Sequence, residues 1–541
     1  MTDNTMYNNI PKEKFRFSSR SDLGHDSKFD TKPVSYFQGA FKRFCKNKGA
    51  IVGGIVISIL VLFSIIAPIF TPFTPAYYDQ VYAFVNPRLS IFEDAGFWDG
   101  CREKTNVGYM AYFRDYALGL ETGREVIKNG EYELSEDGQN YSYRYDTYYG
   151  VGFGFYKIIS LAEYQDIQRY QNETGRQVIY PTVATKDRPK ALQDVGDASY
   201  YYKTQTVNGK TRPVLDENGD PIPVYWTYYE GGYVSPSIVP YNSLRIEGDE
   251  GFLQYDANGN AVKNEDGTDR IHYYAYGRAL DGGVEVRVEY YEYYTYQHTQ
   301  VLKDGISEPN FIFGTTETGK DIFACLAYGA RFSFIFASIV AIVNFIVGVI
   351  WGSVAGYFGG RIDLFMERFT DILGAVPTMI VISLLKYHMG STTQVLVLFI
   401  SFFATGWISM AGTTRMQFYR FKNQEYVLAA RTLGASDSRI MFKHIFPNGL
   451  GTIVTSMALV IPGMIYSETS LSYLGIINLE SGSTTSVGTL IAAGQQSIIK
   501  DGASYVALFP CLFLVLLMLS FNLFGNGLRD AFNPSLRGSE E

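Results

Sequence analysis

The stretch that most resembles a nucleotide-binding motif is "GTTETGKD", residues 314–321, which fits the G-x-x-x-x-G-K pattern of a phosphate-binding loop. In such a loop, backbone N–H groups and the lysine hold phosphate oxygens, and a Ser or Thr after the lysine binds magnesium. Asp321 occupies that position here, and its carboxylate would repel a phosphate. The stretch also precedes a long apolar run instead of joining a strand to a helix. We therefore expect no ATP binding, no catalytic or metal-binding residues and no cofactor in this chain.

Two carboxylates, Asp371 and Glu468, lie within or at the edge of apolar runs. Ionisable groups inside a membrane are costly, so both are candidates for contact with a solute that crosses it. Each also has a structural interpretation: Asp371 near a helix end, paired with Arg368, and Glu468 at the outer end of a broken helix. Pro377 and Pro462 interrupt the same runs, and the carbonyl groups that they free need other partners.

A polar, basic stretch, "EYVLAARTLGASDSRIMFKHIFPN" at residues 425–448, lies between two apolar runs. Asn423 and Ser436 are plausible N-caps, Gly434 fits the left-handed position that ends a helix, and Pro447 fits a helix end. The pattern predicts two helices of about ten residues joined at Gly434, and helices this short are marginal in water. The stretch holds too many apolar side chains for a free loop. We expect it to dock, either on this chain's own membrane helices or on a cytoplasmic partner.

The elements around these residues are apolar runs long enough to cross a bilayer of about 30 Å. The first, residues 51–70, carries no charge and follows about 50 polar residues, so we expect a span and not a cleaved signal peptide. The sequence predicts an α-helical polytopic membrane protein with six transmembrane helices. The other five runs are residues 332–356, 369–386, 395–411, 450–474 and 503–525.

The distribution of basic residues predicts the orientation in the membrane. Cytoplasmic loops carry an excess of Lys and Arg, which places the N-terminus and, after six spans, the C-terminus in the cytoplasm. The basic residues on this side are Lys42, Arg43, Lys46, Lys48, Arg361, Arg368, Arg415, Arg420, Lys422, Arg431, Arg439, Lys443, Arg529 and Arg537. The predicted segments are a cytoplasmic part (1–49), helix 1 (50–70), an outer insertion (71–310) and a membrane core (311–541) with a loop at 423–448.

The outer insertion is acidic, with 36 Asp and Glu against 22 Lys and Arg, which explains the net charge of −8 and argues against nucleic acid as a partner. Asn-Gly and Asp-Gly pairs separate β-prone runs such as "GGVEVRVEYYEYYTYQ", so we expect a β-rich domain with some helix near 156–172. It contains a single cysteine, Cys101, and therefore no internal disulfide.

Tyrosine is concentrated in the insertion, which holds 33 of the 43 in the chain. The first interpretation is packing between neighbouring strands, and the second is an exposed aromatic surface that binds a peptide or another protein. His272 and His298 are isolated, which favours structural roles.

With these features in place, the chain resembles the permease subunits of bacterial ABC importers of the dipeptide/oligopeptide class, in particular the C-type subunit. The stretch at 425–448 resembles that family's "EAA" loop. The segments 313–334, "GYFGGRIDLFMERFTDILGAVPTMIV" (356–381), "SETSLSYLG" (467–475) and "FNLFGNGLRDAFNP" (521–534) resemble its other signatures. Leu428 departs from the pattern, because the family has the first Glu of E-A-A there. Phe446 also departs, because the family has Leu there, and the large insertion is a third departure.

The resemblance implies a type I ABC importer permease fold in a bacterial cell membrane, a heterodimer with a second permease subunit, two ABC ATPase subunits that bind ATP and magnesium, and an extracytoplasmic peptide-binding protein. The two short helices would form the coupling region. The residues carried over to it are Glu425, Ala429, Ala430, Gly434, Arg439, His444 and Pro447.

The transported solute implied by the resemblance is a short peptide, although relatives also move nickel complexes. A different class of protein, a membrane receptor with an outer ligand-binding domain, explains the insertion directly but predicts a cytoplasmic output domain. We expect the insertion to dock the binding protein, to help capture peptides, or to shield the pore.

Overall fold

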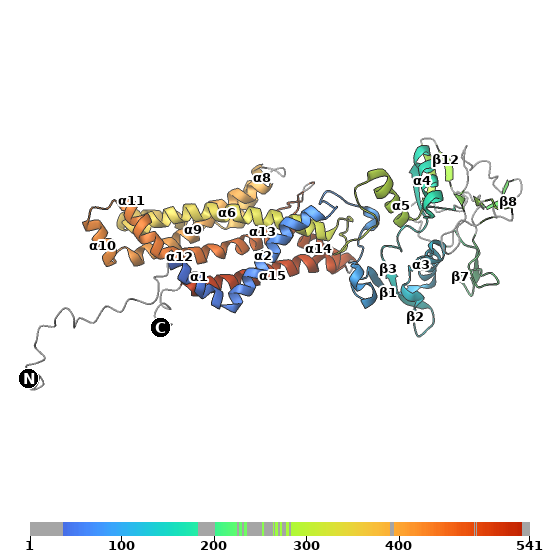
Figure 1. Ribbon diagram of the computed structural model, residues 1–541, viewed down its shortest axis with the longest axis horizontal. Coiled ribbons are helices and arrows are strands. Elements are labelled where there is room, and N and C mark those ends of the chain that lie inside the picture. Colours follow the sequence, from blue (N-terminus) through green and yellow to red (C-terminus); the bar gives the residue numbers. More distant parts are fainter. Residues whose placement is uncertain are drawn as a thin grey trace, which may run out of the picture.

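The computed structural model describes residues 36–532 except 182–197, 199–200, most of 224–282, 390–393, 481, 483 and 502. It consists of a long helical bundle and a mixed domain at one end of it (Figure 1). Within the described residues, five helical segments are long and apolar enough to span a membrane, and a sixth span is possible if one bent helix pair is counted. The five segments are α2 (Lys48–Phe70), α6 (Ile322–Phe358), α9 (Gln394–Phe421), Asp437–Tyr473 and α15 (Tyr505–Phe532).

The bent pair consists of α7 (Gly360–Gly374) and α8 (Thr378–Met389), which meet at an angle of 67°. Pro377 lies in the break between them, where the residue before a proline is pushed out of the helical region. The span predicted at 369–386 is therefore a broken helix. Two shorter helices complete this part of the chain: α1 (Tyr36–Lys46) before the first span and α14 (Val487–Asp501) before the last.

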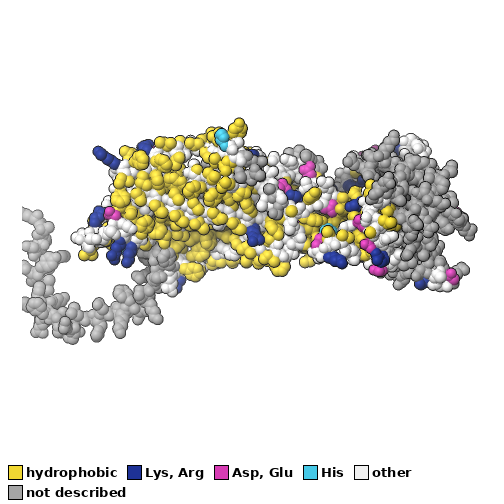
Figure 2. Space-filling model, turned by 90° about the horizontal axis from the view of Figure 1, so that it is seen from above, with side chains coloured by type: hydrophobic (Ala, Val, Ile, Leu, Met, Phe, Trp, Pro, Cys, Tyr) yellow, Lys and Arg dark blue, Asp and Glu magenta, His cyan; other side chains and the backbone are white. Residues whose placement is uncertain are grey.

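Glycine allows the membrane helices to approach closely. A Cβ atom added at Gly352 of α6 would lie 2.2 Å from the carbonyl oxygen of Ala411 in α9, and one at Gly527 of α15 would lie 2.1 Å from the Cβ of Ala50 in α2. Lipid gives apolar helices no hydrophobic reason to associate, so close van der Waals contact at small residues drives their packing. Apolar side chains cover the outside of the bundle, as expected for a surface that faces lipid (Figure 2).

In its described residues, the mixed domain contains short antiparallel sheets and three α-helices. One sheet has the order β1-β3-β2 (Cys101–Gly108, Asn140–Asp146, Glu133–Leu134), and the other has β12-β13-β4 (Gly277–Leu280, Gly283–Val288, Phe155–Ile159) with β5 (Ile179–Tyr180) also paired to β13. The helices are α3 (Tyr109–Thr122), α4 (Leu161–Thr174) and α5 (Tyr290–Tyr296). The two-stranded pairs are β6–β7 (Thr204–Val207, Lys210–Pro213), β8–β9 (Thr227–Tyr229, Gly232–Val234) and β10–β11 (Phe252–Leu253, Ile271–His272).

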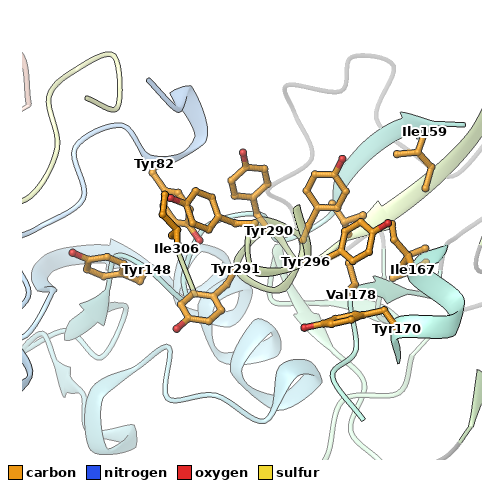
Figure 3. Close-up of a cluster of buried hydrophobic side chains, with 14 of the residues drawn as sticks. Tyr82, Tyr148, Ile159, Ile167, Tyr170, Val178, Tyr290, Tyr291, Tyr296 and Ile306 are labelled. Atoms are coloured by element: carbon orange, nitrogen blue, oxygen red, sulfur yellow. The ribbon is translucent and has the colours of Figure 1, made fainter. Parts of the chain in front are cut away.

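The tyrosines of this domain form much of its core, but not mainly as pairs across strands. The run predicted as one strand ends as a strand at Val288 and continues as α5, because Glu289 caps that helix by accepting hydrogen bonds from the N–H groups of Tyr291 and Glu292. The tyrosines of α5 are buried and surrounded by rings from distant segments, among them Tyr82 and Tyr148 (Figure 3). These tyrosines pack in the core, but from a helix and not between neighbouring strands, so the strand prediction for 290–296 is wrong.

Candidate functional site

The stretch at 425–448 lies at the end of the bundle opposite the mixed domain (Figure 1). Its first helix, α10 (Glu425–Thr432), has Gln424 at the N-cap, so the prediction of Asn423 is wrong by one residue. The side chain of Gln424 makes no capping hydrogen bond. Gly434 has φ of +80°, its N–H donates to Arg431 O, and the N–H of Ala435 donates to Ala430 O. These two bonds form a Schellman motif, so the helix end predicted at Gly434 is confirmed.

The second helix is not a separate ten-residue helix that ends at Pro447. It begins with α11 (Asp437–Arg439) after Ser436, continues as a π-helix (Ile440–Ile445), and enters α12 (Phe446–Ala458) and α13 (Val460–Tyr473) without leaving the membrane span. Pro447 lies in the first turn of α12, where a missing N–H costs little. The π-helix before Pro447 has wider hydrogen-bond rings than an α-helix, and the hydrogen bonding changes from the π to the α pattern at the start of α12. The second half of the loop is therefore the end of a membrane helix.

One face of this loop docks on the chain itself. Val427, Ile440 and Ile445 are fully buried, in a cluster with Tyr357 at the end of α6 and Phe418 near the end of α9. The loop is thus fixed to two membrane helices by apolar burial.

The opposite face of the loop is uncovered and carries both large apolar and charged side chains. Leu433 is 88% exposed, and Leu428, Phe442 and Tyr426 are also exposed. Among the residues singled out by the sequence, those exposed are Glu425, Ala429, Gly434, Arg439 and Pro447, whereas Ala430 and His444 are half-buried. A short helix that is fixed to membrane helices on one face and exposes large apolar side chains among charged ones on the other has the form of a contact surface for another protein.

Tyr357 links the two halves of the loop. Its hydroxyl donates to Asp437 Oδ1 at 2.5 Å, and the Arg431 guanidinium donates to that hydroxyl at 3.4 Å and lies 5.7 Å from the ring centroid. Asp437 begins the second helix and Arg431 lies in the last turn of the first, so one side chain of α6 contacts both. Because Val427 of α10 is buried in the same cluster as Tyr357, a movement of α10 would be passed to the end of α6.

A second network near this end of the bundle was missed by the sequence analysis. Arg415 of α9 binds the Asp363 carboxylate of α7 with two hydrogen bonds, at 2.6 and 2.7 Å, and also reaches Glu367. The Tyr419 hydroxyl donates to the same carboxylate at 2.5 Å. Planar two-point pairs of this kind are strong and directional. The sequence showed Arg415 only as one more basic residue of a cytoplasmic loop, because 52 residues separate it from Asp363.

Glu468 of α13 is 1% exposed and belongs to a polar cluster inside the membrane bundle. Its carboxylate accepts hydrogen bonds from the hydroxyl groups of Ser486 at 2.7 Å, Ser472 at 3.1 Å and Ser333 at 3.4 Å. These donors come from α6, α13 and the segment before α14, so the side chain joins three elements. Next to the cluster, a cavity of about 400 Å³ is lined by Ser472, hydroxyl groups before and within α14, and the turn at 316–320.

Asp371 lies in the last turn of α7 and is exposed. Arg368, one turn earlier, donates to its carboxylate at 3.1 Å, which is the pairing that the structural interpretation predicts. The two candidate pathway residues therefore have unlike surroundings, one buried among hydroxyl groups and the other on the surface of a bent helix.

The stretch 314–321 forms a tight turn between the mixed domain and the bundle. Thr315 Oγ1 donates to Tyr82 O at 2.5 Å and accepts from the N–H of Val85, and a Cβ added at Gly319 would lie 1.7 Å from Asp79 O. Asp321 caps α6 by accepting from the N–H groups of Phe323 and Ala324, and burial raises the pKa of this carboxyl to about 7. The glycines and the aspartate thus have structural roles at a junction.

Comparison with known proteins shows where this chain has relatives. Residues 348–538 match the family described as binding-protein-dependent transport system inner membrane component, and residues 35–87 match the N-terminal TM domain of oligopeptide transport permease C. The oligopeptide transport system permease protein OppC of Bacillus subtilis is 40% identical over 245 residues, which cover 45% of this chain and 78% of the relative.

Two further similarities differ in strength. The dipeptide transport system permease protein DppC of B. subtilis is 40% identical over 44% of this chain and 74% of its own length. A solved inward-facing structure of the MetNI methionine ABC transporter is similar with a TM-score of 0.31 and 14% identity, over 39% of this chain and 96% of that chain, and carries no further argument.

Proposed function

The chain belongs to the family of binding-protein-dependent transport system inner membrane components, and we propose that it forms half of the translocation pathway of an ATP-driven importer of short peptides. In this proposal a second permease subunit forms the other half, two separate ATPase subunits bind and hydrolyse ATP with magnesium, and an extracytoplasmic binding protein delivers the peptide. The relatives named as oligopeptide and dipeptide permeases support the choice of substrate. The receptor alternative is not favoured, because the relatives are transport components.

The observation that carries the mechanism is the two-faced loop at 425–448. Its inner face is fixed to α6 and α9 by apolar burial and by Tyr357, and its outer face exposes Leu428 and Leu433. An ATPase subunit that binds the outer face would move α10, and the contacts of the inner face would pass that movement to the membrane helices. A ligand or nucleotide then changes the balance between inward-open and outward-open states by its different affinity for each.

In the proposed orientation, residues 425–448 and both termini lie in the cytoplasm, and the mixed domain lies outside the cell. The Arg and Lys side chains near α10 and at the ends of α1 and α15 support this assignment through the positive-inside rule. Glu425, Ala429, Ala430, Gly434, Arg439, His444 and Pro447 remain the proposed coupling residues, and Glu468 and Asp371 the proposed pathway residues. The burial of Glu468 beside a polar cavity makes it the stronger of these two candidates.

The coupling proposal is tested by Leu433→Asp. This side chain is 88% exposed, so the change places a charge on the docking face without disturbing the core. We expect the purified variant to lose the ATPase subunits that accompany the wild-type chain, and peptide uptake by vesicles to fall with them. Leu134→Asp, at a 51% exposed position of the mixed domain, is the matched control. Full retention of the ATPase by Leu433→Asp would contradict the assigned contact surface.

For the mixed domain, we propose that it docks the binding protein and helps to capture peptides. It is joined firmly to the bundle: the Trp98 indole donates to Ile312 O, and its ring lies 5.4 Å from that of Phe509 at the outer end of α15. Phe313 stacks on Phe509 at 4.1 Å. A protein bound to the domain would therefore be held in a defined position over the bundle.

The role of the domain is tested by deletion of residues 80–300. We expect peptide uptake and the affinity for the binding protein to fall, while the chain still reaches the membrane. Uptake and affinity that both remain at the wild-type level would exclude docking and capture, and leave shielding of the pore.

A further inference from the structure

Helix α1 precedes the first membrane span and is fixed to the end of the last one. Ala40 is buried, and the ring of Phe44 lies 5.2 Å from that of Phe524 in α15. The Arg43 guanidinium donates two hydrogen bonds to the carbonyl oxygen of Ala531, at 3.0 and 2.8 Å. A cation at the C-terminal end of a helix satisfies carbonyl groups that lack helical partners and interacts favourably with the helix dipole. One face of α1 is thus a built contact with the bundle.

A second face of α1 is apolar and is not covered by the described part of the chain. Phe41 is 66% exposed, and Cys45, four residues later, is also exposed. Residues four apart lie on the same side of a helix. Phe41 and Cys45 thus form a short exposed apolar stripe along this side of the helix.

A third face of α1 is cationic. Lys42 and Lys46, again four residues apart, lie beside the apolar face, and Lys48 follows at the start of α2. The helix sequence YFQGAFKRFCK contains no acidic residue. A helix that combines an apolar stripe with a basic stripe is typical of segments that lie in the plane of the membrane surface.

The covalent connection places α1 at that surface. Its last residue, Lys46, is separated from the first residue of the span by Asn47 alone, whose side chain accepts a hydrogen bond from the N–H of Ala50 and so begins the new helix. Figure 1 shows α1 in dark blue alongside α15, on the same half of the bundle as α12. The apolar face can therefore reach the outer part of the acyl chains while the lysines remain at the level of the headgroups.

We propose that α1 lies in the membrane interface and binds acidic phospholipid headgroups of the leaflet on the side of the 425–448 loop. Electrostatic attraction to an anionic leaflet favours each nearby basic residue roughly fivefold. A lipid partner is favoured over a protein because the apolar and basic stripes are adjacent and the helix is joined directly to a span. The proposal goes beyond transport, since it concerns only where α1 lies.

Cys45 provides a natural reporter for the experiment. The full-length chain is labelled with a thiol-reactive bimane in vesicles made of equal mole fractions of phosphatidylcholine and phosphatidylglycerol. In one set of vesicles the phosphatidylcholine carries bromine as the quencher, and in a second set the phosphatidylglycerol carries it. The signal of Cys45→Ser, labelled in the same way, is subtracted to remove the contribution of Cys101 and Cys511. Aqueous iodide serves as the quencher that reports exposure to water.

We expect bromine near the carbonyl end of the acyl chains to quench Cys45 strongly and iodide to quench it weakly. Brominated phosphatidylglycerol should quench several-fold more than brominated phosphatidylcholine. Replacement of Lys42, Lys46 and Lys48 by Gln should reduce this preference severalfold, and the matched replacement of three exposed lysines of the mixed domain, Lys203, Lys210 and Lys303, should not.

Four results would overturn the proposal. Strong quenching by iodide would place α1 in water. Weak quenching by both iodide and the brominated lipids would place it against protein. Equal quenching by the two lipids would exclude selection of acidic headgroups. Loss of lipid quenching when the ATPase subunits are added would likewise show that a protein, and not the bilayer, covers this face. None of these results depends on peptide uptake, so the proposed transport function can fail or hold separately.

Discussion

The contact between Tyr357 and the 425–448 loop leads to a quantitative prediction for Tyr357→Phe. The substitution removes one oxygen atom and keeps the ring in the cluster with Ile440 and Ile445. The lost hydrogen bond is the one to the Asp437 carboxylate at 2.5 Å, and hydrogen bonds to charged groups contribute about 1.5–3 kcal/mol. Asp437 is exposed, so water replaces part of the lost bond, and we take the lower end, about 1.5 kcal/mol. The contact from Arg431 at 3.4 Å is at the limit of a hydrogen bond, and we assign it nothing.

A change of about 1.5 kcal/mol alters an equilibrium roughly tenfold. We therefore expect the loop of the variant to open about tenfold more often, which hydrogen–deuterium exchange of the amides in residues 433–440 measures. Peptide uptake per ATP hydrolysed should also fall, because the loop moves more independently of α6. Tyr387→Phe, at an 84% exposed position of α8, is the control that loses the same oxygen without a partner in the loop.

The reasoning would be refuted by unchanged exchange at residues 433–440 in Tyr357→Phe. That result would mean that apolar burial alone holds the loop, and that the hydroxyl contributes nothing measurable. Faster exchange with unchanged coupling of ATP hydrolysis to uptake would separate the structural role of the contact from its proposed role in transport.

Three further predictions concern the stability of the full-length chain. Glu468→Ala leaves three buried hydroxyl groups without their acceptor and should lower the free energy of unfolding by about 3 kcal/mol or more. Glu468→Gln keeps an acceptor and should lower it clearly less. Equal losses of the two variants in thermal unfolding would contradict the role of the cluster. A Cβ atom added at Gly434 meets no atom within 4 Å, so Gly434→Ala should lower the free energy of unfolding only through backbone strain, by about 1–2 kcal/mol at a φ of +80°. Gly412→Ala is also in open space but lies within α9, and it should leave stability unchanged or raise it. Burial raises the pKa of Glu289 from 4.5 to about 7. Between pH 4.5 and 7 the folded domain therefore keeps a proton that the unfolded chain releases. The free energy of unfolding of the domain should fall by up to about 3 kcal/mol as the pH rises across that window, and then level off. Glu289→Gln should remove this part of the pH dependence, as measured by denaturant unfolding at pH 5 to 8, and an unchanged slope would refute it.

The helix end at Gly434 shows which local features could be predicted. A left-handed glycine after helix-forming residues is a local signal, and both hydrogen bonds of its motif join residues within five positions of one another. The end predicted at Pro447 failed because a proline is equally compatible with the first turn of a helix, and only the packing of Ile440 and Ile445 on α6 and α9 continues the helix through it. The strand predicted through Tyr290–Tyr296 failed for a related reason, since tyrosine favours strands in general but here packs around a helix capped by Glu289.

The sequence by itself determined the membrane class, five of the six predicted spans and the loop at 425–448, because apolar length, positive charge and helix-ending residues are properties of short segments. Only the tertiary structure decided what the polar residues do. Asp363 and Arg415 are 52 positions apart, Glu468 meets hydroxyl groups from three elements, and the turn at 314–321 holds the root of the mixed domain. Such partners meet only when particular helices pack together. The helices are similarly apolar in sequence, so no local pattern shows which of them will be neighbours or which of their polar residues will meet.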